Sequence, residues 1–152
     1  MGRGINFLFW QPQASGKQVL QQFLRLKMAS QMQQGAAKGL TEGLQEDLAA
    51  GRPVEVAGYR LGAGLAQGLA ASALLPVPGG ARLCWLEVTT REPAQLLPAA
   101  KPVRDAWRAA GFEVDSEAVS GPPFWQTLEI EDAPELVTAT VSILNSTLGV
   151  RL

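Results

Sequence analysis

The sequence predicts a single α/β domain, 1–152, from two observations. In the second half of the chain, apolar strand-like segments at 82–88 and 112–119 are each followed by a helix-like segment, at 102–110 and 134–148. Strands that alternate with helices of about 10 to 15 residues are typical of βαβ units and of a mostly parallel sheet flanked by helices. With 152 residues, the chain is also long enough to bury a sizeable core.

The first predicted strand is Ile5-Asn-Phe-Leu-Phe-Trp10, which is almost continuously apolar. Continuous apolarity is typical of a strand buried on both faces, and such a strand needs neighbours on both sides. The remaining strand-like segments are too few to surround it. We therefore expect that N-terminal strands are missing, or that another polypeptide, including a second copy in a homo-oligomer, pairs with this strand.

A helical segment is predicted at about 12–80, between the first strand and the regular alternation, and the resemblance described below implies that it is a cap-like excursion. Apolar residues recur at helical spacing in its first part, with Gln, Arg and Lys at the other positions. Helices are expected at 18–34, at 41–50 with Thr41 as N-cap, and at 61–75, and a short strand or an extended segment at 54–59. The prolines and glycines of 76–80 end the excursion.

Residues at two helix ends support the alternation that follows. Gly111 lies where the helix 102–110 should end, because a glycine adopts the left-handed backbone that closes many helices. Pro134 lies in the first turn of the last helix, where its missing N–H costs nothing. We therefore expect these two helices to be bounded as predicted.

Composition excludes several classes of partner. The net charge is −1 and the basic residues are dispersed, so neither nucleic acid nor an anionic membrane surface is expected as a partner. No apolar run is long enough to span a membrane and no signal-peptide pattern is visible, which predicts a cytoplasmic protein without membrane insertion. The single cysteine, Cys84, is expected to be a buried thiol. With no histidine and no clustered acids, neither a metal nor a cofactor is expected.

The absence of histidine restricts the chemistry most. Histidine is the usual proton shuttle beside a serine or cysteine nucleophile, because its pKa lies near neutrality. The sequence also contains no Gly-x-Ser-x-Gly nucleophile elbow. A self-contained Ser-His-Asp hydrolase is therefore excluded.

Two loop or helix-start segments are candidates for ligand binding. Ser15-Gly16-Lys17 precedes a helix and follows the end of a strand, so it predicts either an anion site or a simple cap with a solvated lysine. The run Gly62-Ala-Gly-Leu-Ala-Gln-Gly68 is one residue too long for a dinucleotide loop and is better explained by close helix packing. The first helix region is rich in glutamine, which predicts a hydrated face or, in a lid, groups that bind a carbohydrate-like or acyl ligand.

Two further candidates lie at the ends of the last two strands. Glu87 stands between apolar neighbours, so its carboxylate must find a hydrogen-bonding partner or act as a catalytic acid with a base supplied from outside this sequence. Gly121-Pro-Pro-Phe-Trp125 is a rigid aromatic loop, which predicts either packing against the sheet edge or the lining of a ligand pocket. Both alternatives stay open at each position.

Several motifs together resemble the exosortase A system-associated hydrolases of the second type, which are α/β-hydrolase-superfamily proteins of bacterial exopolysaccharide and protein-sorting loci. The similarity covers nearly the whole chain. It rests on Phe7-Leu-Phe-Trp-Gln-Pro12, Ser15-Gly-Lys-Gln18, Gln21-Gln-Phe-Leu-Arg-Leu26, Val56-Ala-Gly-Tyr59, Trp85-Leu-Glu-Val88 and Gly121-Pro-Pro-Phe-Trp-Gln126.

The resemblance implies an α/β-hydrolase-like sheet that lacks the N-terminal strands and the nucleophile elbow. In that fold the acid follows the first of the last two strands and the histidine follows the second. The first position offers Glu87 or Glu92, and the second offers the loop 121–125, which has no imidazole. Glu87 is the expected catalytic acid, and ligand contacts are expected from Gln11, Ser15, Lys17, Trp125 and Gln126.

The function implied by the resemblance is hydrolysis of an ester or thioester in an exosortase or exopolysaccharide system, by a protein that is inactive as this chain alone. The ligand would be a small ester or an acyl or carbohydrate-like molecule. The alternative is a non-catalytic binding or scaffolding protein that kept the hydrolase sheet and lost the triad.

Overall fold

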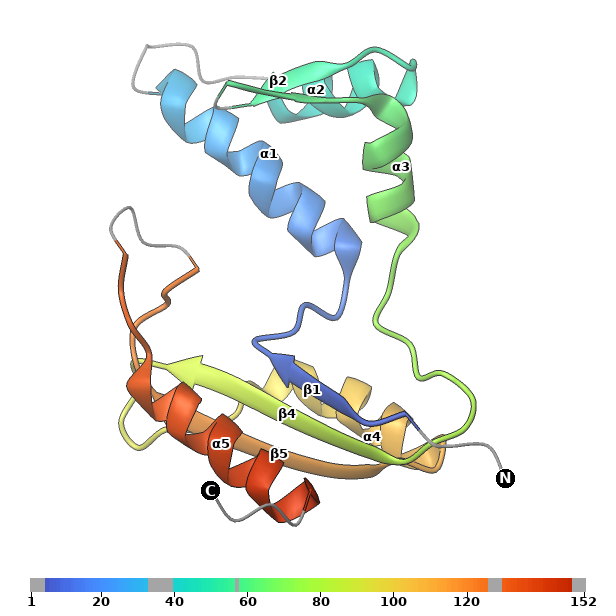
Figure 1. The fold of residues 1–152 in the computed structure, drawn as a ribbon. Helices are drawn as coiled ribbons and strands as arrows, with labels where there is room; N and C mark the ends of the chain where they lie inside the picture. Colours follow the sequence, from blue (N-terminus) through green and yellow to red (C-terminus); the bar gives the residue numbers. More distant parts are fainter. Residues whose placement is uncertain (1–4, 33–39, 57, 126–129, 149–152) are drawn as a thin grey trace. The chain divides into compact units, whose positions relative to one another are not determined.

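The computed structural model describes residues 5–32, 40–56, 58–125 and 130–148. The chain divides into two compact units. Unit 1 comprises residues 1–12 and 75–152, and unit 2 comprises residues 13–74. Unit 1 holds a sheet flanked by helices, and unit 2 holds helices with a short hairpin (Figure 1).

Unit 1 is built on a three-stranded parallel sheet, so the predicted α/β class is confirmed. Its strands are β1 (Phe7–Trp10), β4 (Arg82–Thr89) and β5 (Glu113–Ser120), in the spatial order β1-β4-β5. Phe7 pairs with Leu83 and Arg82 pairs with Glu113, which sets the two registers. The strands therefore occur in the sheet in the same order as in the sequence.

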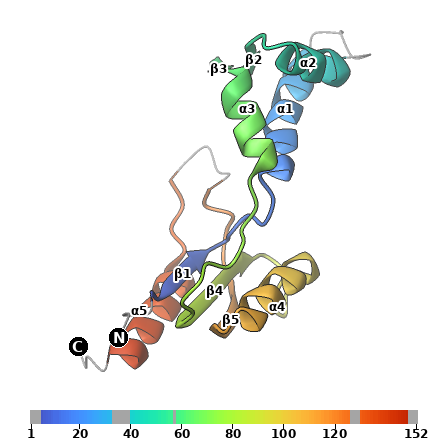
Figure 2. The same cartoon turned by 90° about the vertical axis from the view of Figure 1, so that its right-hand side faces the viewer.

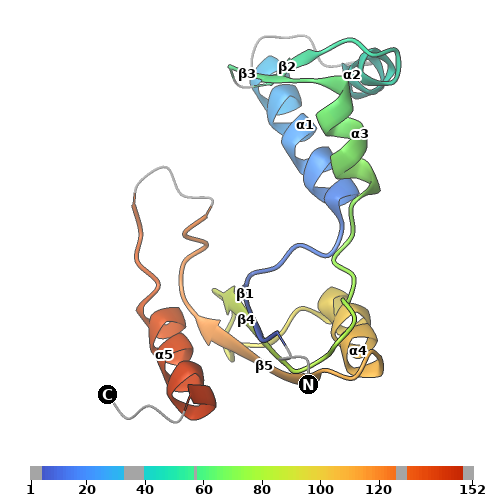
Figure 3. The same ribbon diagram turned by 45° about the vertical axis from the view of Figure 1, so that its right-hand side comes forward.

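Helices cover both faces of this sheet. Helix α4 (Lys101–Ala109), preceded by a 3-10 turn at Pro98–Ala100, covers one face, and α5 (Pro134–Leu148) covers the other (Figures 2 and 3). On the α4 face, the Trp107 ring packs edge-on against Phe7 and Phe9, with centroids 5.3 and 5.6 Å apart. On the α5 face, a second core contains Leu86, Val88, Val119, Leu136 and Ala139.

The strand buried on both faces is β4, where residues 83–88 are all buried. Among the described residues, β1 has a neighbouring strand on one side only, so the second neighbour expected from missing N-terminal strands or from another polypeptide stays a prediction. β1 lies at the edge of the sheet and Trp10 is 46% exposed. The apolar side chains of β1 pack on both faces of the sheet. Phe7 and Phe9 contact Trp107 on the α4 side, and Leu8 packs on the α5 side.

The predicted helix ends in this unit were close to the observed ones. Gly111 follows α4 with a φ of +92°, and its N–H donates to the Arg108 carbonyl at 2.9 Å. This left-handed residue closes the helix as expected. Pro134 begins α5, which has the predicted bounds. Helix α4 starts one residue earlier than expected, because the 3-10 turn leads directly into it.

The described residues of unit 2 form three helices and one hairpin. They are α1 (Gly16–Met32), α2 (Leu40–Ala49), β2 (Val54–Val56), β3 (Tyr59–Leu61) and α3 (Ala63–Ala71). The predicted single strand at 54–59 is in fact this antiparallel hairpin, because the chain turns at Gly58 with a φ of +81°. Thr41 lies inside α2 and not at its N-cap position, since the helix already begins at Leu40.

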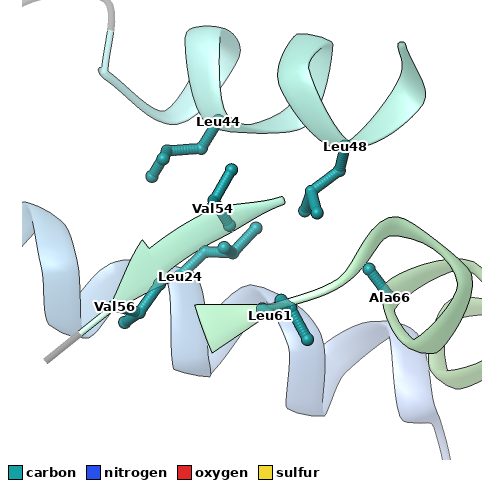
Figure 4. Packing of buried hydrophobic residues seen from close by; sticks show 7 residues of the cluster. All are labelled: Leu24, Leu44, Leu48, Val54, Val56, Leu61 and Ala66. Carbon is teal, nitrogen blue, oxygen red and sulfur yellow. The ribbon is translucent and has the colours of Figure 1, made fainter. Parts of the chain in front are cut away.

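The core of unit 2 is a separate hydrophobic cluster (Figure 4). Side chains from all five elements converge in it: Leu24, Leu44, Leu48, Val54, Val56, Leu61 and Ala66. Burying an aliphatic side chain stabilises a fold by about 1.5–3 kcal/mol. This cluster therefore holds the hairpin against the helices.

Candidate ligand-binding site

The carboxyl ends of β1, β4 and β5 meet at one edge of the sheet in unit 1. Three of the predicted site positions lie there, because the strands are parallel: Gln11 after β1, Glu87 near the end of β4, and the loop 121–125 after β5. Open α/β sheets bind ligands outside the carboxyl ends of their strands. A ligand site in unit 1 is therefore expected at this edge.

Glu87 is held by donors from its own unit. Its side chain is 3% exposed, and its Oε1 accepts a hydrogen bond from the Trp85 indole Nε1 at 2.7 Å. Its Oε2 accepts from the Leu97 backbone N–H at 2.6 Å. Oε2 thus anchors the loop after β4 to the strand, while Oε1 binds a side chain of the same strand, and both contacts favour a structural role. Glu92, the other position considered for an acid, lies exposed in that loop.

Gln11 is also occupied by the sheet. Its N–H donates to the Leu86 carbonyl at 2.8 Å, and its Oε1 accepts from the Val88 N–H at 2.8 Å. The side chain therefore continues the β1–β4 ladder after the strand has ended. It does so with a φ of +43°, a left-handed conformation that is unfavourable for a residue with a Cβ.

The loop after β5 contributes aromatic rings at this edge. The Gly121 N–H donates to the Thr89 carbonyl at 3.1 Å, and the Phe124 ring packs with the α5-side core. Phe124 also stands edge-on to Trp10 and Trp125, with centroids 6.5 and 5.1 Å away. Trp125 is 39% exposed and accessible to a ligand, whereas Gln126 lies outside the described residues.

The segment before α1 is tied down by backbone contacts within unit 2. The Gly16 N–H donates to the Ser72 carbonyl at 3.1 Å, and Ser15 forms an isolated bridge with Ala73. A Cβ built on Gly16 would lie 2.0 Å from the Leu69 carbonyl oxygen. The glycine is therefore required for close packing against the end of α3. Ser15 and Gly16 do not form an open anion cradle.

The glycine run at the start of α3 does not pack closely, so that prediction was wrong. A Cβ added to Gly62, Gly64 or Gly68 would meet nothing within 4 Å. Gly62 is instead the N-cap residue of α3, in extended conformation. The glycine that packs closely is Gly16, at the start of α1, which lies against the Leu69 carbonyl near the end of α3.

A pocket of about 370 Å³ lies among the three helices of unit 2. This volume falls within the range of small-molecule sites. Its walls combine leucine and alanine side chains with three glutamines and one lysine: Lys17, Leu20, Gln21, Leu24, Gln45, Leu48, Ala49, Ala66, Gln67 and Ala70. Of the predicted ligand residues, only Lys17 lines it. Gln21 belongs to the glutamine-rich region that the sequence indicated.

The other lining residues could not be found from the sequence. Gln45 and Ala49 come from α2, and Gln67 and Ala70 come from α3. Each lies on an exposed or half-buried helix face, and although Gln67 belongs to the glycine run 62–68, no pattern in the sequence assigns any of the four to a pocket. Only the packing of three helices brings them around one space.

Arg104 is a buried cation that the sequence analysis did not single out. It is 8% exposed, and its Nη1 donates to the Ser116 hydroxyl at 2.8 Å. Its Nε has no hydrogen-bond partner in the described part of the chain. It lies on α4, in a segment that reads as an amphipathic helix, and nothing in the sequence marked it as buried.

The Cys84 thiol is not activated by its surroundings. Burial raises the pKa of the Cys84 thiol above its usual value, so the thiol stays protonated and is a poor nucleophile. No group of three or more His, Cys, Asp or Glu side chains within the described ranges could hold a metal ion. Within the same ranges, no helix is both long and apolar enough to cross a membrane.

Comparison with known proteins adds no assignment. No protein-family model matches the sequence, and neither curated proteins nor solved structures give a match. Any functional conclusion must therefore rest on the residues and their geometry.

Proposed function

We propose that this chain is part of an α/β-hydrolase-like protein of the ester or thioester class, as its resemblance to the exosortase-associated hydrolases implies, and that it contributes ligand binding. The observation that carries the proposal is the strand order. β1, β4 and β5 are parallel and consecutive in the sheet, with the compact unit 2 inserted after β1. This arrangement is expected if β1 is the strand that follows the nucleophile-elbow strand and unit 2 is the cap-like excursion after it.

The open edge of β1 supports the same proposal. Among the described residues it has no strand on its outer side, and it carries none of the charged residues that usually protect a sheet edge. By contrast, the outer strand β5 carries Glu113, Asp115 and Glu117. Further strands, from a longer protein or from a second copy, would add at β1.

The alternative is a non-catalytic binding or scaffolding protein, and two observations favour it. Each carboxylate oxygen of Glu87 accepts a hydrogen bond, from Trp85 and from Leu97, and the sequence contains no histidine to act as a base. A nucleophile and a base would both have to come from residues outside this sequence. Under either proposal, this chain binds a ligand and does not catalyse ester or thioester hydrolysis by itself.

Ester turnover separates the two proposals. We would assay p-nitrophenyl esters of increasing acyl length with the printed chain and with a protein that includes any in-frame sequence upstream of Met1. The hydrolase proposal expects turnover from the longer protein only, because the printed chain has no histidine. No turnover above buffer from either protein, across all acyl lengths, would overturn it in favour of the binding protein.

A further inference from the structure

The pocket of unit 2 combines an apolar interior with a polar margin. Leu24, Leu48 and Ala66 are almost completely buried and come from α1, α2 and α3 (Figure 4). They belong to the core cluster of the unit and form the floor of the pocket. The apolar side chains that a ligand could contact above this floor are Leu20, Ala49 and Ala70, which are half-buried or exposed.

Among the described residues that line the pocket, Lys17 is the only charged one. It lies beside Gln21, which is one helical turn further along α1. Neither side chain has a hydrogen-bond or ion-pair partner among the described residues. One ammonium beside neutral amide donors is suited to a head group with one negative charge and several acceptor oxygens.

We propose that this pocket binds a medium-chain alkyl carboxylate, with the aliphatic chain against Leu20, Ala49 and Ala70 and the carboxylate at Lys17. At roughly 30 Å³ for each small group, the pocket has room for a chain of about ten carbons. The carboxylate accepts hydrogen bonds from the Lys17 ammonium and from glutamine amides. This inference goes beyond the proposed function, because the ligand is held whether or not an ester is cleaved.

Calorimetric titration of the full chain with decanoate tests the proposal. Binding should tighten from hexanoate to decanoate by up to about fourfold for each added methylene, as each one is removed from water. Lys17→Gln should weaken decanoate by about two- to fivefold, as expected for one partly exposed ion pair, and should leave decanol unchanged. Arg25→Gln is the matched control, because Arg25 is an exposed cation of α1 that does not line the pocket.

A second variant tests where the alkyl chain of the ligand binds. Ala49 lines the pocket but is exposed, so Ala49→Trp should fill the space without disturbing the core, and decanoate should then bind more weakly. Circular dichroism of each variant checks that it is folded. Decanoate binding no tighter than acetate, or equal losses in Lys17→Gln and Arg25→Gln, would overturn the proposal. Tighter binding of decyl phosphate than of decanoate would overturn the carboxylate assignment.

Discussion

The carboxyl edge of the sheet in unit 1 and the pocket in unit 2 use their polar residues in opposite ways. At the sheet edge, the side chain of Glu87 accepts two hydrogen bonds and that of Gln11 accepts one within the unit. In the pocket, the side chains of Lys17 and Gln21 make none with the described residues. A buried polar group must be satisfied by its own fold, whereas a group at the margin of a pocket can wait for a ligand. The residues that look most reactive in the sequence are therefore the ones already used by the fold.

The largest expected effect comes from removing the Glu87 carboxylate. Glu87→Ala leaves the Trp85 indole N–H and the Leu97 N–H without an acceptor, which should lower the free energy of unfolding by about 3 kcal/mol. Urea denaturation measures the change. The matched control is Glu117→Ala, at an exposed carboxylate on β5, which should change stability by less than about 0.5 kcal/mol.

The variant Glu87→Gln tests whether the role of Glu87 is only structural. One amide oxygen can still accept a hydrogen bond, so this variant should lose less stability than Glu87→Ala. If it keeps full stability yet abolishes ester turnover in a longer protein, Glu87 is a catalytic acid and the contrast between the two regions fails.

A smaller effect is expected at Gln11, where two causes can be separated. Gln11→Ala removes the acceptor of the Val88 N–H and keeps a Cβ at positive φ, so it should destabilise the chain by about 1–2 kcal/mol. Gln11→Gly removes the same acceptor but relieves the left-handed strain, so it should be about 0.5–1 kcal/mol more stable than Gln11→Ala. Equal stability of the two variants in urea denaturation would mean that the backbone conformation contributes nothing.

The smallest effect is expected at the pocket margin. Gln45→Ala and Gln67→Ala remove exposed side chains that have no partner among the described residues, and alanine is a better helix former. Each should change the free energy of unfolding by less than about 0.5 kcal/mol. Thermal unfolding monitored by circular dichroism measures this. A loss above 1 kcal/mol at either position would show that the pocket margin supports the fold as the sheet edge does.

The elements of unit 1 were predicted well because their signals are local. The apolar run at 82–88, Gly111 after α4 and Pro134 at the start of α5 each act through the backbone of a few neighbouring residues. The hairpin of unit 2 was missed because three residues on each side are too short for a period-2 pattern to be distinguished from one strand. The role of Gly16 was missed because the residues it contacts, Leu69 and Ser72, lie more than fifty positions away.

The sequence by itself determined the α/β class, the absence of a histidine base and the richness of the first helix in glutamine, since these follow from composition and short-range pattern. The tertiary structure decided that β4 and not β1 is the central strand, and that Glu87 anchors a loop. It also decided that Lys17 lies beside residues of α2 and α3. These outcomes depend on contacts between distant segments, and no local propensity encodes which buried group will find which partner.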